Sequence, residues 1–112
     1  MQSLPQTPAV TEMSEYRYCL RGEIDLENAP QLRSDLKLAL ARGTHLLIDC
    51  TNLRFIDSAG VAVLLEAHAE LEADGRHMLI QNVQRGPRLI LEALGLTDLL
   101  RYQRDADSRA LS

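Results

Sequence analysis

Residues Leu46 to Leu65 read LLIDCTNLRFIDSAGVAVLL, and this stretch decides the fold. It begins with a short aliphatic run, which is typical of a strand buried on both faces. It ends in an apolar run with helical spacing, and a short loop joins the two. At the start of the helix lies DSAG, Asp57 to Gly60, where a carboxylate, a hydroxyl and a glycine precede the most hydrophobic part of the chain. Strand, loop and helix in this order predict an α/β unit.

The rest of the chain repeats this alternation. Asn28 and Pro30 mark a helix start, and Gly43, Gly75 and Gly95 mark helix ends. The predicted strands cover residues 16–24, 45–49 and 77–83, and the predicted helices cover residues 28–43, 59–73 and 86–95, with a capped turn from Thr97 and a last strand after Tyr102. We therefore predict an α/β domain with a small mixed β-sheet of four to five strands packed with about four helices. Strands 45–49 and 77–83 are expected to be parallel neighbours, because helices connect them.

The chain has 112 residues, which is enough for one domain. We expect that domain to span residues 16–104, after a flexible N-terminal tail at 1–15 that can add an edge strand and before a C-terminal tail at 105–112. Hydrophobic residues make up 46% and charged residues 25%, the balance of a soluble globular protein.

Charge and hydropathy exclude several classes of partner. The net charge is −4 and no basic run is present, which argues against binding to nucleic acid or to an anionic membrane. No apolar segment approaches the ~20 residues that a membrane-spanning helix needs. The first ten residues lack the basic and apolar regions of a signal peptide. We therefore expect a cytoplasmic protein.

Groups for catalysis or metal binding are scarce. Cys19 and Cys50 lie in apolar runs without a CxxC motif, so reduced and buried thiols are expected, with a disulfide as the weaker alternative. His45, His68 and His77 lack the spacing of metal ligands. We predict no enzyme activity, no catalytic residue, no metal and no cofactor.

Two chemical alternatives stay open at this point. Glu23, Asp25 and Asp57 could gather into an acidic site for Mg²⁺, although acidic residues at loop ends are usually solvated. Ser58 could be the nucleophile of a small hydrolase, but the sequence identifies no base for it, and Ile56 stands where a GxSxG motif has glycine.

The DSAG tetrapeptide has an ordinary interpretation and a functional one. In the ordinary one, Ser58 caps the helix and Asp57 adds a favourable charge. In the functional one, Gly60, which costs ~1 kcal/mol relative to alanine in a helix, leaves an open patch of backbone. Asp25 ends an earlier strand and is expected at the same sheet edge. A hydroxyl here can also carry phosphate, because the free N–H groups and the helix dipole stabilise an anion.

Three segments resemble one known family. LLIDCTNLRFIDSAGVAVLLEAHAEL is similar to the central segment of the STAS domain, in particular that of the small anti-sigma factor antagonists of bacteria. Those proteins have a strand ending in Asp, a short loop, Asp-Ser-x-Gly and an apolar helix. LRGEIDLENAPQLRSDL resembles their first strand and the helix after it, and LEALGLTDLL resembles their closing helix. The resemblance covers roughly residues 16–104.

The resemblance implies a phosphorylation switch. The unphosphorylated antagonist would bind an anti-sigma factor that is also an ATP-dependent serine kinase, and so free a sigma factor. The kinase would phosphorylate Ser58 and be released, and a phosphatase of the PP2C type would reset the switch. By the same match, Asp57 would orient the serine or contact the kinase, Asp25 would lie near the site, and Gly60 would admit the partner.

A second function is compatible with the same family. Some STAS domains are constitutive scaffolds or accessory subunits, in stressosomes or with transporters, and are not regulated by phosphorylation. The intact Asp-Ser-x-Gly motif and the absence of a fused sensor domain favour the switch.

Overall fold

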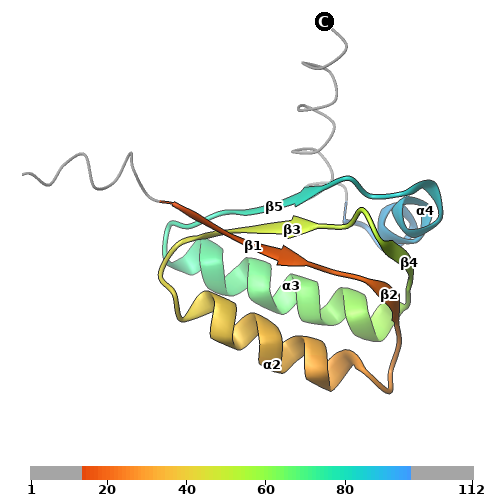
Figure 1. Ribbon diagram of the computed structural model, residues 1–112, viewed down its shortest axis with the longest axis horizontal. Coiled ribbons are helices and arrows are strands. Elements are labelled where there is room, and N and C mark those ends of the chain that lie inside the picture. The colour runs from red at the N-terminus through yellow and green to blue at the C-terminus, as the bar shows by residue number, and fades with distance from the viewer. Residues whose placement is uncertain (1–13, 97–112) are drawn as a thin grey trace, which may run out of the picture.

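The computed structural model describes residues 14–96, and within them the chain alternates strands and helices as predicted (Figure 1). The predicted tails, the turn capped by Thr97 and the segment after Tyr102 fall largely or wholly outside the described residues. The elements are β1 (Glu15–Cys19), β2 (Gly22–Ile24), α2 (Ala29–Leu40), β3 (His45–Asp49), β4 (Leu53–Ile56), α3 (Ser58–Ala73), β5 (Met78–Gln81) and α4 (Arg85–Ala93).

The main sheet has three parallel strands in the order β1-β3-β5. The expected parallel pairing of residues 45–49 with the strand near residue 80 is confirmed. The central strand β3 buries Leu46, Leu47 and Ile48, which explains its unbroken aliphatic run. The α/β class is confirmed, with five strands and three helices in the described part of the chain.

The expected single strand over residues 16–24 is wrong, because the chain turns between β1 and β2. Gly22 has a φ of +71°, which redirects the backbone at a cost that only glycine avoids. After this turn β2 leaves the main sheet and pairs in parallel with β4. The loop predicted before DSAG was also wrong, since residues 53–56 form β4. Leu53 and Ile56 are buried while Arg54 and Phe55 are exposed, so the strand shows no alternation that a sequence pattern could reveal.

The helices form two groups around the sheets. Helices α2 and α3 pack against each other and lie on one face of the main sheet, whereas α4 packs beside β4 (Figure 1). The guanidinium of Arg33 on α2 donates to both carboxylate oxygens of Glu66 on α3, at 2.9 and 3.0 Å. The core between the layers is aliphatic, and aromatic residues make up only 4% of the chain.

One charged residue in the described part of the chain, Arg76, is buried. Arg76 is 9% exposed and donates to the backbone oxygens of Leu40 and Thr44 and to the carboxylate of Asp74. It thereby holds the turn after α2 against the turn after α3.

Both cysteines are free thiols, but only one is buried. Burial raises the pKa of Cys50 to about 12, which makes it unreactive. Cys19 is exposed on β1, so the expectation of two buried thiols is wrong for that residue.

Candidate functional site

Ser58 is the first residue of α3, and its side chain is exposed. The residue that caps the helix is Asp57, whose Oδ1 accepts hydrogen bonds from the N–H groups of Ala59 at 2.9 Å and Gly60 at 3.2 Å. The interpretation of Ser58 as the cap is therefore wrong. Because a carboxylate already satisfies the first N–H groups, the Ser58 hydroxyl makes no hydrogen bond within residues 14–96. It is free to react or to meet a partner.

Asp57 is also fixed by the backbone on both sides. Its N–H donates to the carbonyl of Ile24 at 3.0 Å, and its carbonyl accepts from Val61 at 3.0 Å. The first bond continues the ladder between β2 and β4, and the second opens the helix. Asp57 thus joins the strand pair to α3 and places Ser58 at that junction.

Asp25 lies at the same sheet edge, as expected from the sequence. Ile24 pairs in register with Ile56 on the neighbouring parallel strand, so Asp25 and Asp57 follow adjacent partners. The Oδ1 atom of Asp25 accepts from the N–H groups of Glu27 at 3.0 Å and of Asn28 at 3.1 Å. Both acidic residues therefore order a tight turn as well as adding charge at the edge.

The turn after β2 is closed by a second set of bonds. Asn28 occupies the N-cap position of α2, as predicted, but its side chain does not cap the helix. Its Oδ1 accepts from the N–H of Asp25, and its Nδ2 donates to the carbonyl of Glu23, each at 2.8 Å. These bonds hold a rigid turn on which Leu26 is 77% exposed.

Gly60 is buried, so the expected open patch of backbone is wrong. A Cβ atom at this position would lie 2.7 Å from Cγ2 of Ile24 and 2.8 Å from Cγ1 of Ile56. The glycine lets the first turn of α3 approach the β2–β4 pair closely. Gly60 therefore packs against the core and not against a partner. Its close contact with the strand pair sets the distance between the start of α3, where Ser58 lies, and the strand ends.

Apolar side chains continue from Ser58 along the exposed face of α3. Ala62 and Leu65 are exposed and follow Ser58 by four and seven residues, the spacing of one helix face. Leu65 is 41% exposed. An exposed hydroxyl beside exposed apolar side chains suits contact with another protein better than it suits a small polar substrate.

The alternative chemistries find little support here. Within residues 14–96, no group of three or more His, Cys, Asp or Glu side chains is placed to hold a metal ion, so the acidic Mg²⁺ site is not formed. A hydrolase would also need a base near Ser58. Two of the three histidines, His45 and His77, instead stack on each other where β3 and β5 begin, with ring centroids 5.2 Å apart. Ser58 lies elsewhere, where β4 ends and α3 begins.

Sequence reasoning missed a second acidic centre, at Asp49. Its carboxylate accepts from the hydroxyl and the N–H of Thr51, from the amide of Asn82 and from the guanidinium of Arg17, at 2.7 to 3.1 Å. These bonds, with that of the Thr51 hydroxyl the largest, hold the pKa of Asp49 well below its usual range. The centre links the middle of β1, the end of β3 and the residue after β5. The available signal was an Asp at a strand end with Thr two residues later.

Comparison with known proteins defines the class. The model of the STAS domain family matches residues 6–108, so the chain belongs to the STAS domain family. Among curated proteins, it is 26% identical over 81 residues to an anti-sigma-B factor antagonist of Bacillus subtilis (strain 168), covering 72% of this chain and 74% of the relative. It is also 26% identical over 83 residues to an anti-sigma F factor antagonist of Paenibacillus polymyxa, covering 72% and 71%.

Solved structures give the same fold. The chain is similar to the anti-sigma factor antagonist SpoIIAA in its unphosphorylated form, with a TM-score of 0.66, 23% identity and coverage of 88% of this chain and 89% of that one. It is also similar to SpoIIAA of Bacillus in its phosphorylated form, with a TM-score of 0.62, 24% identity and coverage of 86% and 90%. Within the part of the chain that the structure describes, no helix is both long and apolar enough to cross a membrane.

Proposed function

We propose that this protein is a cytoplasmic anti-sigma factor antagonist, switched by phosphorylation of Ser58. Unphosphorylated, it binds an anti-sigma factor that is also a serine kinase and thereby frees a sigma factor. The kinase transfers phosphate from its own ATP to Ser58, the complex dissociates, and a PP2C-type phosphatase restores the binding form. The chain itself is a binding module and not an enzyme.

The observation that carries this proposal is that Asp57, and not Ser58, caps α3. The Asp57 carboxylate accepts the hydrogen bonds of the first N–H groups, so the exposed Ser58 hydroxyl is not needed to stabilise the helix start. A serine that capped the helix would be costly to modify, because phosphorylation would compete with the cap. Here the hydroxyl can accept phosphate while the helix keeps its first hydrogen bonds.

Electrostatics explain how one phosphate could end binding. Phosphorylation adds ~1.5 to 2 negative charges at a helix N-terminus, where the dipole supports them in water. A partner that covered the same surface would bury these charges beside Asp57 and close to Asp25, which costs several kcal/mol when they are unpaired. Since ~1.4 kcal/mol changes affinity tenfold, this suffices to release the partner.

The relatives support both states of the switch. The names of the curated relatives describe antagonists of anti-sigma factors, and SpoIIAA has been solved with and without phosphate. Both forms of SpoIIAA match this chain with similar TM-scores, which agrees with a modification that changes the charge of a surface and leaves the fold intact.

The test is a capture experiment with four baits in lysate of the native host: wild type, Ser58→Ala, Ser58→Glu and the control Ser34→Glu. Ser34 is exposed on α2, so its substitution adds the same charge away from the site. We expect all baits except Ser58→Glu to retain an anti-sigma factor with a kinase fold. If Ser58→Glu retains the same partner as wild type, the chain is a constitutive scaffold and the switch is wrong.

A further inference from the structure

The turn that follows β2 carries an exposed apolar side chain between two acidic ones. Leu26 is 77% exposed, more than any other large hydrophobic residue in the described part of the chain, and Asp25 and Glu27 flank it. Hydrogen bonds made by the side chains of Asp25 and Asn28 fix the backbone of this turn. The leucine is therefore presented on a rigid turn, so a partner that covers it has little conformational entropy to remove.

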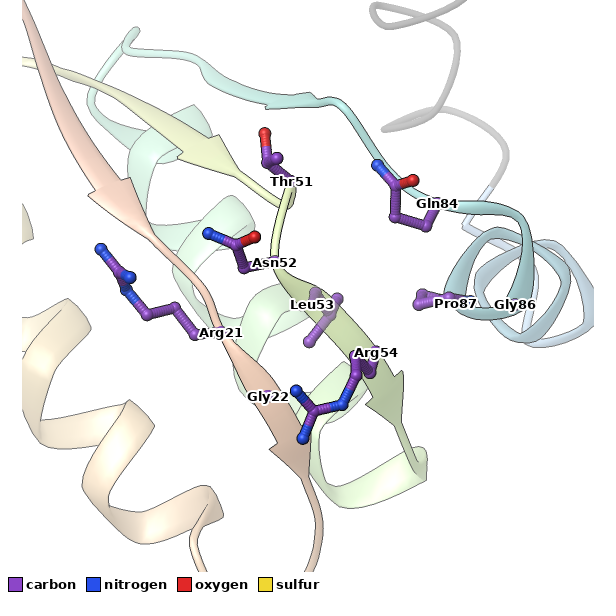
Figure 2. Close-up of a pocket in the computed structure, with 9 residues that line it drawn as sticks. All are labelled: Arg21, Gly22, Thr51, Asn52, Leu53, Arg54, Gln84, Gly86 and Pro87. Atoms are coloured by element: carbon purple, nitrogen blue, oxygen red, sulfur yellow. The ribbon is translucent and has the colours of Figure 1, made fainter.

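A hollow of about 650 Å³ lies at the other end of β2, between the β2–β4 pair and the start of α4. Figure 2 shows Arg21 and Arg54 on the strand side of this hollow and Pro87 on the α4 side. Leu53 and Pro87 supply apolar surface in the lining, which contains no acidic residue. The hollow therefore combines apolar surface with positive charge, whereas the turn combines apolar surface with negative charge.

The two arginines of the hollow are available for contact with another molecule. Within residues 14–96, Arg21 makes no ion pair. Arg54 has a loose contact, 3.9 Å from its Nη2 to Oε2 of Glu23, and 73% of its side chain is exposed. A Cβ atom on Gly22, which also lines the hollow, would meet nothing within 4 Å, so the surface beside the arginines is open.

We propose that two copies of this chain form a two-fold symmetric dimer, in which the Leu26 turn of each copy enters the hollow of the other. Every copy carries both complementary features, at opposite ends of a strand of three residues that spans ~10 Å. Two copies placed antiparallel along β2 bring each turn to the hollow of the other copy. Both contacts then form at once, as a two-fold axis requires.

The contact is complementary in polarity and in charge. Leu26 would leave water against the apolar surface of Leu53 and Pro87 in the other copy, which is favourable. The acidic residues on either side of the leucine would face the two arginines of the hollow. Opposite charges across an interface select this pairing over others and fix its register. The proposal does not depend on the role of Ser58.

The first test is sedimentation equilibrium of the full chain over a range of concentrations. We expect the average mass of wild type to rise from one chain to two and no further, because a two-fold interface is closed. Leu26→Ser should weaken dimerisation at least about tenfold, since it removes the apolar contact. The matched control is Leu38→Ser, because Leu38 is 73% exposed on α2 and outside both the turn and the hollow. This control should dimerise as wild type does.

A charge exchange tests whether the turn meets the hollow. Arg54→Glu and Glu27→Lys each place like charges across the contact, so each alone should weaken dimerisation about tenfold. An equimolar mixture of the two variants should dimerise again, because opposite charges then face each other at both contacts. Lys37→Glu on α2 changes the net charge as Arg54→Glu does and should have no effect. All substituted side chains are exposed, so circular dichroism should show the wild-type fold in each variant.

Three results would overturn the proposal. Wild type could remain a monomer at the highest concentration that stays in solution. Leu38→Ser could weaken dimerisation as much as Leu26→Ser does, or the mixture of Arg54→Glu with Glu27→Lys could fail to associate. An average mass that rises beyond two chains would overturn the two-fold arrangement. Ser58→Ala should dimerise as wild type does, so these outcomes are independent of partner capture at Ser58.

Discussion

The same dipeptide, Ile-Asp, stands at the ends of two strands of this protein, but the surroundings of the two aspartates differ. Asp49 is the last residue of β3, and Asp57 directly follows Ile56, the last residue of β4. Each aspartate accepts a hydrogen bond from the N–H two residues later. After Asp49 the chain continues into the buried Cys50, and the carboxylate is surrounded by Arg17, Thr51 and Asn82. After Asp57 it continues into the exposed Ser58.

The difference lies in what else each carboxylate must hold. Asp49 connects β1, β3 and the residue after β5, and its side chain is only 12% exposed, so its neighbourhood is closed. Asp57 satisfies backbone groups of its own turn and frees the adjacent side chain. An aspartate at the end of a strand can thus hold neighbouring strands together or leave the next side chain exposed. The outcome depends on whether its hydrogen-bond partners lie on other strands or in its own turn.

The largest effect is expected from breaking the closed end. Asp49→Ala leaves Arg17, Thr51 and Asn82 without their shared acceptor, so that four hydrogen bonds to a charged group are lost together. We expect the free energy of unfolding to fall by about 2 to 4 kcal/mol in urea denaturation. A loss below about 1 kcal/mol would show that Asp49 is not a lock.

The same carboxylate makes stability depend on acid. Its pKa is low in the folded protein and close to ~4 when unfolded, so the unfolded state takes up the proton first. The stability that Asp49 contributes is complete above the unfolded pKa and is lost as the pH falls toward the folded one. We expect wild type to lose stability below about pH 4 more steeply than Asp49→Asn. Equal slopes would contradict the assignment.

A smaller effect is expected from Gly60→Ala, which tests the close approach of α3. The added methyl group meets side chains of Ile24 and Ile56 in the core, and overpacking costs more than the ~1 kcal/mol that alanine gains in a helix. We expect a net loss of about 1 to 2 kcal/mol by urea denaturation.

Gly86→Ala is the matched control for that prediction. Gly86 is also in the first turn of a helix, but a Cβ there lies 3.9 Å from the backbone oxygen of Arg54, an ordinary contact. This variant should be neutral or more stable than wild type. Equal destabilisation by both substitutions would mean that the contact at Gly60 does not matter.

The smallest effect on stability is expected from substituting Asp57, and this substitution also tests partner binding. Asparagine caps helices about as well as aspartate, so Asp57→Asn should change the free energy of unfolding by less than ~0.5 kcal/mol, whereas Asp57→Ala should lose ~1 kcal/mol. If the charge of Asp57 contributes to partner binding, Asp57→Asn weakens capture by the unphosphorylated protein, as measured by calorimetry with the purified partner. Unchanged affinity would leave Asp57 with a capping role alone.

The order of elements was readable from the sequence, because long helices with regular spacing and an unbroken aliphatic strand carry strong signals. The parallel pairing of β3 with β5 and the placement of Asp25 at the edge followed from that order. Strand β4 was missed, since four residues with buried ends and an exposed middle have no period to detect.

The details of the site depend on contacts between distant segments. Asp57 and Ser58 are both good capping residues, so the sequence could not decide between them. Glycine is required at position 60 because a larger residue would clash with Ile24, which lies on another strand. This contact joins distant segments, so the sequence pattern could not reveal it. The buried Arg76 has backbone carbonyls as partners, which leave no mark in the sequence.

The separation of β2 and β4 from the main sheet has a consequence for motion. These strands contain three and four residues, and within residues 14–96 they pair only with each other, so few strand hydrogen bonds must break for them to open. Segments of this kind exchange their amide hydrogens through local opening, well before the whole domain unfolds. We expect the amide of Asp57, which donates to the carbonyl of Ile24 across this pair, to exchange faster than that of Ile48 in the central strand. The proposed phosphate acceptor, Ser58, follows directly on this strand pair, so local opening of the pair would move it while the main sheet stays intact.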